Sequence, residues 1–106
     1  MRPSALIAAL LFGLPAPAAA IQLTSQGCDA LAGWSFDVVW ARQVGADKEK
    51  VRASLVELAD RDRRGIMRLL LRDFEMLWAT NAAPEIVLQI VQLDCHQRRG
   101  KYGEGT

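Results

Sequence analysis

The residues of this sequence with the greatest capacity for chemistry are two cysteines, Cys28 and Cys95, and the only histidine, His96. A cysteine and a histidine can form a nucleophilic pair, but neighbours on a helix point about 100° apart. Haem attachment needs two cysteines before the histidine. A structural zinc ion needs four ligands, more than two thiols and one imidazole supply. We therefore predict no metal, no cofactor and no catalytic residue.

The first twenty residues have the pattern of a secretory signal peptide. Arg2 gives a basic start, an apolar run extends from Ala5 to Leu14, and small residues follow as far as Ala20. The run is about ten residues long, half of the ~20 that a membrane-spanning helix needs. We expect cleavage after Ala18 or Ala20, with Ala20 preferred, and a soluble protein in the periplasm or outside the cell.

Export changes how the two cysteines are interpreted, because disulfides persist in oxidising compartments. With two cysteines and none left over, the sequence predicts one disulfide, Cys28–Cys95. A disulfide-bonded sulfur is not a nucleophile, which is a second argument against catalysis by Cys95.

The apolar residues after the signal peptide have helical spacing nearly throughout, and no hairpin signal interrupts them. This pattern predicts four helices, at about 28–44, 47–61, 63–79 and 84–97. No apolar residue occurs over 60–65, which indicates a turn, although one continuous helix through it is an alternative. Short loops favour an all-α fold, a four-helix antiparallel bundle, with a single domain over 21–100 and a flexible tail over 101–106.

The bundle agrees with the cysteine positions, because Cys28 starts the first helix and Cys95 ends the fourth, so both lie at one end. The fourth helix has one narrow polar stripe and is otherwise apolar, so we expect it to be the central helix. Gly33 weakens the first helix by about 1 kcal/mol relative to alanine. It could instead allow another backbone to approach closely.

Asp94 stands on the apolar side of the fourth helix, beside Cys95. A carboxylate in such a place needs a partner. We expect Asp94 to be buried in a structural ion pair with Arg42, near the end of the first helix, or with Arg98, one turn further on.

A partner-binding surface is one interpretation of the third helix. Arg64, Arg68 and Arg72 are four residues apart and would form a basic column, and Trp78 on the same helix could anchor an interface. The alternatives are a solvated charged face and a tryptophan at the edge of the core.

Charge and composition narrow the class of function. Arg2 is the only charged residue among the first twenty, so the remainder carries 12 basic and 12 acidic side chains, a formal net charge of zero. This balance argues against nucleic-acid binding, which needs a basic surface. A chain this short also has little room for a deep cofactor cleft.

Several short motifs resemble those of small secreted two-cysteine helical proteins of proteobacteria. They are Cys28 at a helix start, Trp40-Ala41-Arg42 with Gly45 after it, Val51 with Leu55, and Asp94-Cys95. In size, compartment and single disulfide the chain is also similar to HdeA-type acid chaperones and to periplasmic immunity proteins that neutralise type VI secreted amidases. The resemblance implies no activity and no functional residue.

These observations together predict a non-catalytic protein that acts through a protein–protein surface. An inhibitor or immunity-type partner of another exported protein is the first expectation, and a periplasmic acid or stress chaperone is the alternative. No nucleic acid and no integral membrane segment after cleavage are expected.

Overall fold

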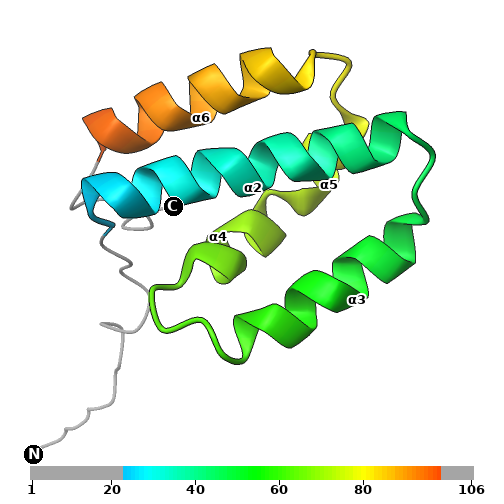
Figure 1. The fold of residues 1–106 in the computed structure, drawn as a ribbon, viewed down its shortest axis with the longest axis horizontal. Helices are drawn as coiled ribbons and strands as arrows, with labels where there is room; N and C mark the ends of the chain where they lie inside the picture. Colours follow the sequence, from blue (N-terminus) through cyan, green and yellow to red (C-terminus); the bar gives the residue numbers. More distant parts are fainter. Residues whose placement is uncertain (1–22, 99–106) are drawn as a thin grey trace, which may run out of the picture.

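A computed structural model describes residues 23–98, so the predicted signal peptide at 1–20 and the predicted tail at 101–106 lie outside the described residues. The described residues form helices and no strands, which confirms the all-α prediction. There are five helices among them rather than the four predicted. They are α2 (Ser25–Gln43), α3 (Lys48–Ala59), α4 (Ile66–Arg72), α5 (Phe74–Ala79) and α6 (Pro84–Gln97) (Figure 1).

The extra helix arises because the predicted helix 63–79 is divided at Asp73. The backbone there leaves the helical region, at φ −99° and ψ 7°, and the Asp73 N–H contacts the carbonyl oxygens of Leu69 and Leu70 at 3.3 and 3.2 Å. The Asp73 side chain makes no capping hydrogen bond at this break, because its carboxylate accepts hydrogen bonds from Arg72 instead. The prediction of a turn over 60–65 is confirmed, because α3 and α4 are separate helices.

Capping groups lie at several of the helix ends, and α2 begins at Ser25, three residues before the predicted start at about 28. The Thr24 hydroxyl accepts a hydrogen bond from the Gly27 N–H at the start of α2, and Asp47 caps α3 in the same way. Gly45 follows the end of α2 with a φ of 86°, a left-handed conformation that suits glycine. Pro84 begins α6.

The central helix is α2, not α6 as the sequence predicted. α2 packs along α6 on one side and against α4, α5 and α3 on the other. In Figure 1, α6 and α3 lie at opposite edges of the molecule. The prediction failed because the second apolar side of α6 has no partner within residues 23–98. No helix in that range is long and apolar enough to cross a bilayer.

The core is formed mainly by side chains of α2, α4 and α5, with Leu55 of α3 and with Val87 and Cys95 of α6. Its largest fully buried residues are Phe74, Ile66, Leu70, Val39 and the two cysteines. Leu55 is the one buried residue of α3, at 4% exposure. The far edge of the molecule is therefore attached by few apolar contacts, and α2 carries most of the packing.

The disulfide between Cys28 and Cys95 is present, as predicted, and it links the start of α2 to the end of α6, which runs antiparallel to α2 (Figure 1). The two Cα atoms are 5.5 Å apart, and both cysteines are fully buried. Beside it, the Asp29 carboxylate accepts a hydrogen bond from Gln92 at 2.8 Å, and the same oxygen lies 3.1 Å from Nε2 of His96. Part of the polar stripe of α6 thus faces α2.

The predicted ion pair between Asp94 and Arg42 is wrong. Because the two helices are antiparallel, Arg42 lies near the start of α6, where its Nη2 donates to the Thr80 carbonyl oxygen at 2.7 Å. Asp94 lies near the other end of α6, half exposed, with its carboxylate 3.8 Å from Arg98. The Arg98 alternative is therefore found, without the burial that was expected of Asp94.

We expect the disulfide to supply a large share of the stability. It closes a loop with a sequence separation of 67 residues, which corresponds to about 4 kcal/mol in the chain-entropy treatment. Urea unfolding of a variant with both Cys28→Ala and Cys95→Ala should show a loss of that order, and reduced wild type should match it. Because both sulfurs are buried, reduction should be slow without denaturant; rapid reduction of the folded protein would contradict this structure.

Because Asp29 is hydrogen-bonded to Gln92 and His96 of α6, we expect the free energy of unfolding to depend on pH in the acid range. The hydrogen bond from Gln92, and then that from His96 and its charge, lower the pKa of Asp29. A carboxyl group with a lowered pKa in the folded state stabilises that state above its ordinary pKa of 3.8, and this contribution is lost as the pH falls through the folded value.

Asp29→Asn should therefore lower the urea midpoint at neutral pH, and the difference from wild type should shrink once the pH is below about 4. Asp37→Asn is the control, because Asp37 is exposed on the same helix and makes no ion pair within residues 23–98. A constant difference between pH 7 and pH 2 for Asp29→Asn would contradict the prediction.

Candidate functional site

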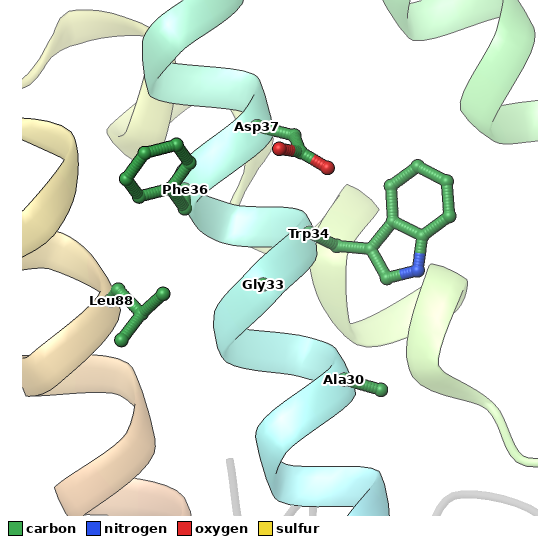
Figure 2. A pocket seen from close by; sticks show the side chains of 6 residues that line it. All are labelled: Ala30, Gly33, Trp34, Phe36, Asp37 and Leu88. Carbon is green, nitrogen blue, oxygen red and sulfur yellow. The ribbon is translucent and has the colours of Figure 1, made fainter.

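A hollow of about 370 Å³ lies over the middle of α2 and is bordered on one side by Leu88 of α6. Figure 2 shows Gly33 between two walls, with Trp34 on one side and Phe36 with Leu88 on the other. Ala30 and Asp37 complete the lining. We call these six residues the α2 groove. Leu88 belongs to α6, so the disulfide-linked pair of helices holds both walls in place.

Gly33 lies in the floor of the α2 groove. A Cβ atom built at this position would meet no atom within 4 Å, and the backbone does not adopt a positive φ. Neither packing nor conformation within the described residues therefore requires glycine. A glycine inside a helix costs about 0.5–1 kcal/mol relative to alanine. Glycine at position 33 therefore makes α2 less stable than alanine would, and a hollow remains at the surface beside it.

The apolar surface continues along α2 beyond the groove. Trp40 and Val44 are 53% and 57% exposed, and they follow Gly33 at intervals of seven and eleven residues, which places all three on one face of the helix. Exposed tryptophan is common at the centres of protein interfaces because it buries a large area. The groove and these two side chains form one apolar face.

Asp37 is the only charged residue in the α2 groove. It is exposed, and no ion pair joins it to any other residue between 23 and 98. A carboxylate at the edge of an apolar groove can select a partner that presents a positive charge at that point. The groove is thus suited to bind an apolar segment with one basic residue, and it holds no group placed for catalysis.

The four residues of the predicted partner-binding surface do not form one exposed surface. Trp78 is half buried and stacks on Phe74, with ring centroids 5.5 Å apart. Trp78 is therefore a tryptophan at the edge of the core, which was the alternative to an exposed anchor. Arg64 precedes Gly65 in the turn before α4, while Arg68 and Arg72 are exposed on α4. The side chain of Arg72 contacts Asp73 at 3.1 Å.

Charged residues near Trp78 are paired with one another. Arg52 lies over the Phe74 ring, 4.6 Å from its centroid, and Arg52 and Lys48 both contact the carboxylate of Glu75. These contacts join α3 to α5 at the surface of the molecule. A second hollow, at the α3–α4 turn, is lined by both signs of charge, including Asp60, Arg61 and Arg68.

The sequence did contain a signal for the groove. Gly33 lies in the first predicted helix directly before Trp34, with Phe36 and Trp40 following it, a combination of a small residue and large aromatic residues that is typical of close helix contacts. This pattern did not identify the groove, because the sequence alone did not show which side of the helix faces the core. No group of three potential metal ligands occurs within the described range.

Comparison of the chain with models of protein families, with curated proteins and with solved structures found no match, so the groove itself is the basis for inferring function.

Proposed function

We propose that this protein is an exported, non-catalytic binding protein that accepts an apolar helix of another exported protein in the α2 groove. The observation that carries the proposal is Gly33, which weakens the central helix and leaves an open hollow that nothing else in residues 23–98 fills. The stability that α2 loses through this glycine would be offset by contacts with a partner whose helix packs closely against the backbone at Gly33. Recognition of an amphipathic helix by an apolar groove is a common mode of binding.

The groove defines the chemistry of the partner helix. A small residue in the partner would lie over Gly33, because packed helices are normally 8–10 Å apart and approach more closely only where side chains are small. Apolar side chains would contact Trp34 and Leu88, and a lysine or arginine would face Asp37. Trp40 and Val44 would extend the contact by more than one helical turn.

Rigidity of the groove favours binding. Phe36 is carried by α2 and Leu88 by α6, and the disulfide prevents the two helices from separating. Little conformational freedom is then lost when the partner binds. The disulfide is also compatible with an oxidising compartment, and the signal-peptide pattern in residues 1–20 supports export.

A chaperone that acts in acid is the second candidate, and the contacts of Asp29 favour it. Protonation of Asp29 would weaken its hydrogen bonds to Gln92 and His96, and large apolar side chains are already exposed. A chaperone of this type would capture many unrelated proteins at low pH only, whereas a helix-binding protein would capture one partner near neutral pH.

Gly33→Ala should stabilise the free protein by about 0.5–1 kcal/mol, because alanine is the better helix former and its methyl group meets no other atom. Urea unfolding of the oxidised protein checks this. Gly27→Ala is the contrasting variant, because a Cβ there would lie only 3.3 Å from Leu23, so it should gain less or lose stability. A loss of stability in Gly33→Ala would show that the fold itself requires the glycine.

Gly33→Leu should abolish the groove while keeping the fold. We expect the partner that wild type captures from a periplasmic extract at pH 7 to bind the purified variant at least ~10-fold more weakly, a difference of about 1.4 kcal/mol. Ala53→Leu, an exposed change on α3, is the matched control and should bind as wild type does. Equal affinity for wild type and Gly33→Leu would refute the proposal, and capture of many proteins only in acid would favour the chaperone.

A further inference from the structure

The hollow at the turn between α3 and α4 has a volume of about 660 Å³. Both helices lie on the side of α2 away from α6 (Figure 1). The lining consists of Ala59 and five charged residues, which are Asp60, Arg61, Asp62, Arg63 and Arg68. We call this place the arginine hollow. It shares no residue with the α2 groove, so the two can be occupied independently.

The three arginines of the hollow have no counter-ion among the described residues. No ion pair or hydrogen bond joins the side chain of Arg61, Arg63 or Arg68 to another group in residues 23–98. Lys50 on α3 is the only other lysine or arginine in that range without such a contact. Basic side chains elsewhere are paired, as Arg52 is with Glu75. The unpaired positive charge of the described chain is therefore concentrated around one hollow.

The two aspartates of the lining do not neutralise the arginines. The Asp62 carboxylate accepts hydrogen bonds from the backbone N–H groups of Arg64 and Met67, at 3.1 and 2.7 Å, and its side chain is only 12% exposed. Asp60 is exposed and makes no ion pair within residues 23–98. The hollow thus combines three guanidinium groups with one carboxylate that is not already bonded, and this excess of positive charge attracts an anion.

The turn that carries the arginines is held in a fixed shape. Gly65 has a φ of 81°, a left-handed conformation that allows the chain to turn sharply into α4. Ile66 and Met67, directly after it, are buried in the core, at 0% and 4% exposure. The hydrogen bond from the Met67 N–H to Asp62 closes the turn. An anion would therefore bind to a backbone that is already in place, so little of its conformational freedom is lost.

We propose that the arginine hollow binds phosphate groups, either of a soluble phosphorylated compound or of anionic lipid headgroups. A phosphate group has three acceptor oxygens that several guanidinium groups can share, whereas a carboxylate has two and suits one. Every basic residue of the hollow is an arginine, whose planar guanidinium binds phosphate oxygens in pairs. The volume lies within the range of about 300–1,000 Å³ that is typical of small-molecule sites, which leaves room for more than a single phosphate ion.

Isothermal titration calorimetry of the oxidised protein with inorganic pyrophosphate, in a buffer without phosphate, tests the proposal. Wild type should bind pyrophosphate, and Arg68→Gln should bind it at least ~10-fold more weakly, because a charge-assisted hydrogen bond is lost. Asp60→Asn should bind it more tightly, since the one free carboxylate of the hollow is removed. Lys50→Gln is the matched control, because it also removes an unpaired positive charge, and it should bind as wild type does.

The source of the phosphate is distinguished by sedimentation with vesicles of phosphatidylglycerol and phosphatidylcholine. If the ligand is a lipid headgroup, wild type and Lys50→Gln should sediment with the vesicles and Arg68→Gln should not. If wild type binds pyrophosphate and stays in solution beside the vesicles, the ligand is a soluble phosphorylated compound. Circular dichroism should show that all variants remain helical, because Lys50, Asp60 and Arg68 are exposed.

Three results would overturn the proposal. The first is a wild type that binds neither pyrophosphate at millimolar concentration nor the vesicles. The second is an equal loss of affinity in Lys50→Gln and Arg68→Gln, which would show attraction to overall charge rather than to the hollow. The third is tighter binding of a glutamate-rich peptide than of pyrophosphate, which would identify an acidic protein as the ligand. Gly33→Leu should bind pyrophosphate as wild type does, so this test is independent of the α2 groove.

Discussion

The pairing of α2 with α6 is the interaction on which the rest of the structure depends. The disulfide Cys28–Cys95 fixes the two helices side by side, and their antiparallel direction then determines which residues meet. Asp29 meets Gln92 and His96 near one end, and Arg42 meets Thr80 near the other.

The same register places Leu88 next to Phe36 and so forms one wall of the α2 groove. A shift of α6 by one residue would rotate Leu88 by about 100° and remove that wall. The disulfide and the packing of α6 on α2 together set the register that forms this wall. The disulfide does so without contributing any atom to the surface, because both sulfurs are buried.

Features set by local chemistry could be predicted from the sequence, and features set by packing between helices could not. Capping residues such as Asp47 act on backbone groups within one turn, so they identify helix ends directly. The break at Asp73 was missed because the apolar spacing continues through it from Leu70 to Leu77. Periodicity also shows that α6 is apolar on two sides, but it does not reveal that only one of those sides is covered.

The sequence misplaced the candidate site for a related reason. A column of arginines is conspicuous in a sequence, whereas an empty space over Gly33 becomes visible only when the neighbouring helix is in place. Asp94 and Arg42 were paired by chemical type alone, although the antiparallel order of the helices separates them. Charges between α3 and α5 are paired within the chain, as at Glu75, while the α2 and α6 surfaces carry large apolar side chains without partners in the described range.

The long separation of the two cysteines along the chain also has a consequence for the order of folding. During synthesis, α2 is complete well before the ribosome has made α6, its main packing partner. Contacts between segments so far apart in sequence form late, because a long loop must close before they are gained. In the interval, the core-facing side of α2 and the thiol of Cys28 are exposed. The disulfide and the main packing of α2 can therefore form only after the chain has been made as far as Cys95.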